Sequence, residues 1–98
     1  MLLEEVDMKI HDISEKKLNA IIETFSDYVE NYFDEANRPE DTPVIVDTHF
    51  DEFVDWAYDD FLLDDEDRVF LKDPDNMKIR SHIKREVTQH FQGMLKAM

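Results

Sequence analysis

Apolar side chains recur every three or four residues between Leu18 and Phe33, and this period restricts the segment to one amphipathic helix. The apolar positions are Leu18, Ile21, Ile22, Phe25, Tyr28, Val29, Tyr32 and Phe33. The preceding stretch 12–15 contains Asp and Ser side chains that can accept hydrogen bonds from free backbone amides. Pro39 ends the pattern, because the residue before a proline is pushed out of the helical region. We therefore expect a first long helix between these two signals.

Two later segments repeat the helical period. A cap at Asp47-Thr48 precedes the second segment, whose stripe is Phe50, Phe53, Val54, Ala57, Tyr58 and Phe61. This helix is expected to end near Leu62 or Leu63. Asp73-Pro74 is typical of an N-cap followed by the first helical residue, and it precedes a ridge of Ile79, Ile83, Val87, Phe91 and Met94. Gly93 is expected to end or fray this third helix.

The connecting segments are less defined. The β-branched run 44–46 fits either a short strand or a buried approach to the second helix, and 68–72 fits a short strand after an acidic loop at 64–67. The N-terminal segment 2–13 fits a helix or a strand, and helix is preferred. The pattern as a whole predicts a mainly α, small single-domain protein spanning 1–98 with three principal amphipathic helices, with short strands near 44–46 and 68–72 left open.

The composition argues against several kinds of chemistry. Gly93 is the only glycine, so a glycine-rich phosphate loop or a nucleophile elbow cannot be built. The chain has no cysteine, and the acidic stretch 64–75 lacks the glycine that an EF-hand loop requires. We therefore expect no cofactor, no bound metal and no enzymatic activity. The absence of a signal-like N-terminus and of a long apolar run predicts a cytoplasmic protein that does not enter membranes.

Charge is the strongest compositional feature, with 25 acidic and 11 basic side chains and a net charge of -14. Residues 1–75 hold 24 acids and 6 bases, which gives -18, whereas residues 76–98 hold 1 acid and 5 bases, which gives +4. This segregation favours a functional surface over mere solubility, although both interpretations stay open. The acidic part should repel nucleic acid, so direct binding to it is not expected. The C-terminal bases are instead expected to pair with the acidic helices, within one chain or across a homodimer.

The acids of the two long acidic helices are spaced so that they form rows. The second helix carries Asp51, Glu52, Asp55, Asp59 and Asp60, and the first carries Glu23, Asp27, Glu30 and Asp34. Like charges three or four residues apart destabilise a helix by a few tenths of a kcal/mol per pair, at about 0.2–0.5. A merely solvated face usually interleaves lysines to remove this repulsion. Both rows are therefore predicted to be partner-binding.

In these rows and in its size the chain resembles the small acidic DNA-mimic proteins of the phage antirestriction type, such as the Ocr and Arn proteins. The resemblance covers residues 15 to 67 and includes no diagnostic motif; the basic third helix departs from the all-acidic pattern. It implies an inhibitor that occupies the basic, DNA-binding groove of a nuclease, a restriction enzyme or another DNA-binding protein, often as a dimer and without catalysis. If the chain is phage-encoded, as the resemblance implies, it would act in the host cytoplasm.

Trp56 supports a different hypothesis. It lies off the apolar stripe, between Glu52 and Asp60 on the helix surface, where a tryptophan is unexpected. Edge packing beneath the first helix would explain it, and so would an exposed anchor for a partner. The second interpretation makes the chain an acidic protein-binding module, such as an immunity protein, antitoxin or adaptor, in which the acids mainly steer association.

Overall fold

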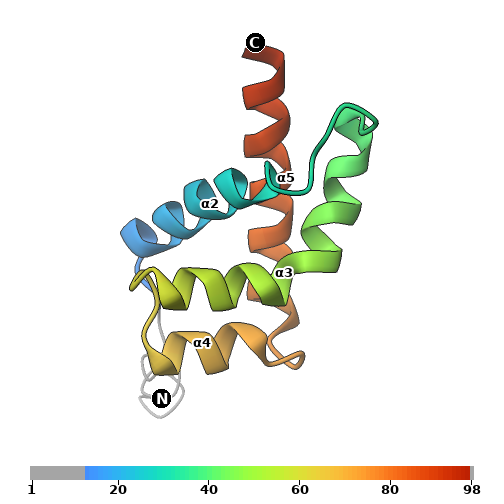
Figure 1. Cartoon of the computed structure of the whole chain (residues 1–98). Helices are drawn as coiled ribbons and strands as arrows, with labels where there is room; N and C mark the ends of the chain where they lie inside the picture. The colour runs from blue at the N-terminus through green and yellow to red at the C-terminus, as the bar shows by residue number, and fades with distance from the viewer. Residues whose placement is uncertain (1–12, 98) are drawn as a thin grey trace.

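The structure, a computed structural model, describes residues 13–97 and builds them from helices (Figure 1). The elements are α2 (Glu15–Val29), the short 3-10 helix η1 (Pro39–Asp41), α3 (Thr42–Asp59), α4 (Asp65–Lys72) and α5 (Met77–Ala97). The mainly α prediction is confirmed, because three long helices are present with α4 as a short fourth. No strand occurs in the described range, so the strands considered at 44–46 and 68–72 are wrong. The question of helix or strand at 2–12 lies outside it.

Helix α2 begins as the sequence predicts and ends earlier. The Ser14 side chain accepts a hydrogen bond from the Lys17 backbone amide at 3.2 Å, as an N-cap does. The helix ends at Val29, well before Pro39. Beyond that point the Asn31 side chain donates to the Tyr28 carbonyl at 3.1 Å, and side chains at 34 and 37 bond to turn backbone. Short polar side chains thus give the backbone an alternative to continued helix.

Helix α3 includes the run 44–46 that β propensity marked as a strand. Pro43 lies in the first turn of the helix, where the backbone amide that proline lacks would have no helical partner. The helix can therefore begin at Thr42, before the predicted cap at Asp47. Ile45 and Val46 are buried in the core. Their burial outweighs the small intrinsic preference of β-branched residues for strands, which spans only about 1 kcal/mol.

The predicted acidic loop and strand at 64–72 form α4 instead. Asp64 and Asp67 make a capping box, in which the Asp67 backbone amide donates to Asp64 Oδ1 at 2.8 Å and the Asp64 amide donates to Asp67 Oδ2 at 3.3 Å. Lys17 of α2 reaches the buried Asp67 carboxylate at 2.7 Å. The acidic side chains at this helix start thus fix local structure.

Helix α5 begins at Met77, after a turn in which Asp73 and Asn76 satisfy backbone groups, and not at Pro74. It continues through Gly93, so the expected end at that glycine is wrong. The core lies where α5 packs against both α2 and α3, and the buried side chains of α5 are Ile83, Val87 and Phe91. The C-terminal turns of α5 extend past α2 (Figure 1). Among residues 13–97, none of the helices has the length and apolar character needed to cross a bilayer.

Candidate partner-binding surface

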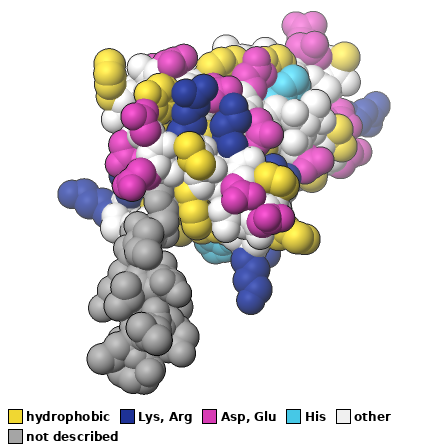
Figure 2. Space-filling model, turned by 90° about the horizontal axis from the view of Figure 1, so that it is seen from below, with side chains coloured by type: hydrophobic (Ala, Val, Ile, Leu, Met, Phe, Trp, Pro, Cys, Tyr) yellow, Lys and Arg dark blue, Asp and Glu magenta, His cyan; other side chains and the backbone are white. Residues whose placement is uncertain are grey.

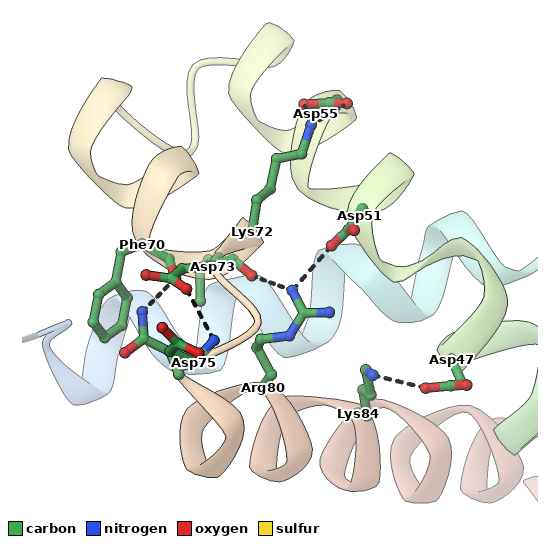
Figure 3. Close-up of polar contacts among 11 residues, drawn as sticks. Asp47, Asp51, Asp55, Phe70, Lys72, Asp73, Asp75, Arg80 and Lys84 are labelled. Atoms are coloured by element: carbon green, nitrogen blue, oxygen red, sulfur yellow. Dashed lines mark hydrogen bonds and ion pairs between the residues drawn. The ribbon is translucent and has the colours of Figure 1, made fainter.

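Three aspartates four residues apart line the side of α3 that faces α4 and α5 (Figure 3). Their nitrogen-to-oxygen contacts are Asp47 with Lys84 at 2.7 Å, Asp51 with Arg80 at 3.0 Å and Asp55 with Lys72 at 3.0 Å. We call these three pairs the charge ladder. Asp47 pairs with the later residue Lys84, and Asp51 pairs with the earlier residue Arg80. The two helices are therefore antiparallel where the ladder joins them.

Arg80 is the most buried cation of the ladder, with its side chain 15% exposed. Besides Asp51, its Nη1 donates to the Leu71 carbonyl at the end of α4 at 2.6 Å. Its guanidinium carbon lies 4.9 Å from the centre of the Phe50 ring, and Lys84 Nζ lies 5.3 Å from the same ring. A cation over an aromatic face is attracted by the ring quadrupole. The ladder therefore covers an edge of the core and also neutralises three of the acids on α3.

The paired carboxylates are stabilised in their charged form. The hydrogen bond from Lys84, supported by its positive charge, lowers the pKa of Asp47. At Asp55 burial alone would raise the pKa, but hydrogen bonds from Lys72 and from Arg68, whose Nε lies 3.0 Å away, outweigh it and the pKa is lowered. Both carboxylates thus stabilise the fold in their charged form, although the Asp47 side chain is 70% exposed.

The expectation that no cation neutralises the acidic row on α3 is wrong at Asp51 and Asp55, which contact cations of α4 and α5, whereas their role in binding a partner stays a prediction. The reason is that a helix has two flanks besides its outer face, and both acids lie on the flank that α4 and α5 cover. The expectation that C-terminal bases pair with the acidic helices is confirmed for Arg80 and Lys84. Figure 2, which shows the molecule from the α4 side, likewise shows Lys and Arg side chains among Asp and Glu.

The opposite flank of α3 meets α2 through aromatic rings. The Tyr32 ring stacks on the His49 ring with centroids 3.7 Å apart and planes 3° from parallel. Glu52 Oε1 accepts the hydrogen bond of the Tyr32 hydroxyl and lies 3.1 Å from His49 Nδ1. The hydrogen bond to Glu52 is the main reason why the pKa of Tyr32 is raised. Glu52, another predicted site residue, is thus held by neighbours on this flank.

Trp56 continues this aromatic contact. Its half-buried ring meets Tyr28 edge-on at 5.2 Å and lies nearly parallel to Tyr32 at 5.9 Å. The Tyr28 hydroxyl donates to Asp60 Oδ2 at 2.6 Å, and burial together with this hydrogen bond raises the pKa of Tyr28. A hollow of about 400 Å³ opens beside the ring, lined by Tyr28, Asn31, Trp56, Asp59 and Asp60. Trp56 therefore packs against α2 and also borders an accessible hollow.

The C-terminal end of α3 has three energetically unfavourable features: acidic residues at the helix terminus, a left-handed phenylalanine, and an exposed aromatic ring. Asp59 and Asp60 stand at the C-terminal end of the helix, where the macrodipole favours cations, and the last turn contains no base. Phe61 follows with φ of 66° in the left-handed region and is 94% exposed. The Phe61 amide bonds to the Tyr58 carbonyl and the Leu62 amide to the Ala57 carbonyl, a Schellman pattern in which glycine is usual. We call Trp56, Asp59, Asp60 and Phe61 the acidic corner.

The predicted row on α2 is only partly helical. Glu23, Asp27 and Glu30 are exposed and form no ion pair with any residue in the described range. Asp34 lies beyond the helix, and its Oδ1 accepts the Ala36 backbone amide at 2.9 Å within a turn. The row is therefore a ridge of three free carboxylates, with Asp34 displaced from it.

Phe61 is a further residue that sequence reasoning placed wrongly. Its spacing from Phe50, Val54 and Ala57 fits the buried stripe, but α3 ends two residues before it. Glycine normally marks such an end, and a phenylalanine there carries no local signal. The one sequence signal near Phe61 is that the two acids before it, Asp59 and Asp60, have no lysine or arginine beside them.

Across residues 13–97, no three acidic or histidine side chains come together in a way that could hold a metal ion. The accessible groups of the surface are suited to non-covalent contact: two acids and two aromatic rings at the acidic corner, and three acids along α2 and its C-cap. No family model, curated protein or solved structure matches the chain.

Proposed function

We propose that the protein is a non-catalytic binding protein whose acidic corner docks onto a basic surface of a partner protein. The observation that carries this proposal is that, among the described residues, some acids are paired with cations of the same chain and others are not. Those facing α4 and α5 are paired within the chain, whereas Asp59 and the α2 ridge form no ion pair in the described range. A partly exposed tryptophan bordered by Asp59 and Asp60 matches the usual composition of an interface, with an aromatic anchor and a polar rim.

Phe61 and its acidic neighbours strengthen the case energetically. A left-handed conformation costs a residue other than glycine roughly 1–2 kcal/mol, and an exposed ring recovers none of this by packing. Because no contact among the described residues offsets this backbone strain, we infer that contacts with a partner offset it. Lysines or arginines of that partner would also relieve the repulsion between Asp59, Asp60 and the helix terminus.

The test is capture from a lysate of the source cells on immobilised wild type and two variants. Phe61→Gly removes the exposed ring and relieves the backbone, so a loss of binding cannot be attributed to unfolding. Asp59→Lys reverses one free charge. We expect a partner that wild type retains at about 50 mM salt and releases near 300 mM, since screening shortens the Debye length, and that both variants fail to retain.

Two matched controls define the outcome. Val44→Gly removes another exposed apolar side chain, and Glu40→Lys reverses an exposed charge away from the acidic corner. Both should capture the partner as wild type does. If the controls lose the partner as readily as Phe61→Gly and Asp59→Lys do, binding depends on total charge and stability and the acidic corner is not the interface.

DNA mimicry is the second candidate, and the free ridge of Glu23, Asp27 and Glu30 favours it. Fixed carboxylates on a helix can meet the lysines and arginines with which a protein grips DNA phosphates. The target would then be a nuclease, restriction enzyme or other DNA-binding protein. Duplex DNA should displace the captured partner, and a Glu23→Lys, Glu30→Lys double variant should weaken capture more than Phe61→Gly. Under the first proposal the order of the two variants is reversed.

A further inference from the structure

An apolar groove, which shares no lining residue with the acidic corner, lies between the residues that follow α2 and the last turns of α5. Its floor consists of Phe33, Phe91, Met94 and Leu95, and its volume is about 430 Å³. Phe33 meets the buried Phe91 edge-on, with ring centroids 5.1 Å apart. The floor therefore rests on the core, while Phe33, Met94 and Leu95 remain partly accessible.

The rim of this groove is acidic. The three exposed side chains Glu30, Asp34 and Glu35 line one side, and no described lysine or arginine lines it. Asp34 Oδ1 accepts the Ala36 backbone amide at 2.9 Å, which fixes this acid within its turn. At this end α5 extends past α2 (Figure 1), and the Gln92 side chain of α5 donates to the Pro39 carbonyl at the start of η1 at 3.0 Å.

We infer that this groove binds a basic amphipathic helix of a partner protein, with apolar side chains on the floor and lysines or arginines along the rim. This mode requires an apolar row and a complementary charged edge, and both are present. A second copy of the chain fits poorly because its net charge is -14. Residues 1–12 fit poorly too, since they hold four acids, at positions 4, 5, 7 and 12, against the single base Lys9.

The probe is a synthetic peptide of about 14 residues, roughly 21 Å as a helix, with leucines on one face, lysines beside them and alanines elsewhere. Two control peptides match it in length. One has the same composition with the leucines scattered around the helix, and the other has glutamate in place of each lysine. Binding to the full chain is followed by NMR, which reports affinity and the residues whose signals move.

We expect saturable binding of the amphipathic peptide, with signals of Phe33, Met94 and Leu95 moving and both control peptides binding at least about tenfold more weakly, since each lacks one of the two complementary features. Met94→Lys should reduce affinity at least about tenfold, because it places a like charge on the floor. Gln89→Lys adds the same charge at an exposed site on α5 and should change affinity less than about twofold.

Equal binding of the scattered peptide would overturn the inference, because attraction to net charge would then explain everything. Signal changes confined to Trp56 and its neighbours would overturn it as well. So would a dimer in sedimentation that Met94→Lys dissociates, since a second copy would then occupy the groove. Phe61→Gly should leave peptide binding unchanged, which separates this inference from the proposed role of the acidic corner.

Discussion

Asp51 of α3 and Arg80 of α5 contact each other at 3.0 Å between Oδ1 and Nη1, and the same guanidinium nitrogen also donates to the Leu71 carbonyl at the end of α4. One side chain therefore connects three helices that are separate in the sequence. Its position over the Phe50 ring places this connection at the edge of the core. These contacts explain why the charged Arg80 side chain can lie in a position that is only 15% exposed.

Arg80→Lys should destabilise the protein by about 1–2 kcal/mol, because the ammonium is a more strongly hydrated point charge and has no plane to stack on the Phe50 ring while it contacts Asp51 and the Leu71 carbonyl. The measurement is urea unfolding followed by circular dichroism. Arg85→Lys is the control, since Arg85 is 60% exposed and its contact with Glu86 is 3.8 Å long. Equal midpoints for the two variants would contradict the role assigned to Arg80.

The lowered pKa values of Asp47 and Asp55 predict a contribution to stability that depends on pH. An acid whose folded pKa is lowered stabilises the fold above its unfolded pKa of about 3.9 and loses this contribution as pH falls through the folded value. Asp55→Asn should therefore lower the unfolding free energy by at most about 1 kcal/mol at pH 7, because the pair is partly exposed.

The difference between wild type and Asp55→Asn should disappear as the pH falls from about 5 to 2, measured by urea unfolding at each pH. Asp59→Asn is the control, because Asp59 forms no ion pair within 13–97; this variant should be neutral or stabilising at pH 7. A difference for Asp55→Asn that stays constant down to pH 2 would show that its charge pairs contribute nothing.

The helical period of the sequence was sufficient to predict the three long helices, because their apolar positions form the core. It failed at 44–46 and 68–72. The packing of Ile45, Val46 and Leu71 against distant helices decides the conformation there, and a single segment does not contain that information. The capping box of Asp64 and Asp67 was readable in principle, but the density of acids around it made a loop the simpler interpretation.

The candidate surface was predictable in composition and not in arrangement. Sequence spacing identified Trp56 and Asp60 as surface residues, and both border the hollow beside α2. Which acids are neutralised depends on where α4 and α5 cross α3, and that is set by tertiary packing. The spacing of Asp51 and Asp59 along the helix is regular, yet one contacts an arginine and the other forms no ion pair in the described range.

Thr42→Val should raise the unfolding free energy by about 1 kcal/mol. The Thr42 side chain is fully buried at the start of α3, and its Oγ1 has no hydrogen-bond partner among the described residues. Valine keeps the shape and removes the unsatisfied hydroxyl. Thr48→Val, at an exposed position of the same helix, should change stability by less than about 0.5 kcal/mol in the same urea experiment. Destabilisation by Thr42→Val would indicate that the hydroxyl does have a partner.

All three tyrosines donate their hydroxyl to a carboxylate: Tyr28 to Asp60, Tyr32 to Glu52 and Tyr58 to Asp65. Burial is the first cause of the raised pKa at Tyr28, and the hydrogen bond to the acid is the first cause at Tyr32 and Tyr58. Stability should therefore be complete below the unfolded tyrosine pKa of about 10 and fall as pH rises beyond it.

An absorbance titration of tyrosinate tests this directly. In the folded protein no tyrosine should ionise with a midpoint at or below about 10, whereas the protein in denaturant should titrate at the ordinary value. Glu52→Gln should move one of the three groups toward that value, because it removes the charge beside Tyr32. A folded-state titration with one ordinary tyrosine before any substitution would contradict the hydroxyl-to-carboxylate contacts.

Phe61→Gly should increase the unfolding free energy by about 1 kcal/mol, because glycine adopts the left-handed conformation at φ 66° without the clash of a Cβ atom. Val69→Gly is the matched control: Val69 is 70% exposed within α4, where glycine should destabilise by about 0.5–1 kcal/mol. The two substitutions should change the unfolding free energy in opposite directions only if backbone conformation, and not the loss of an exposed apolar side chain, decides the outcome. A destabilised Phe61→Gly would mean that the ring contributes to the fold, and the argument that its strain serves a partner would then lose its basis.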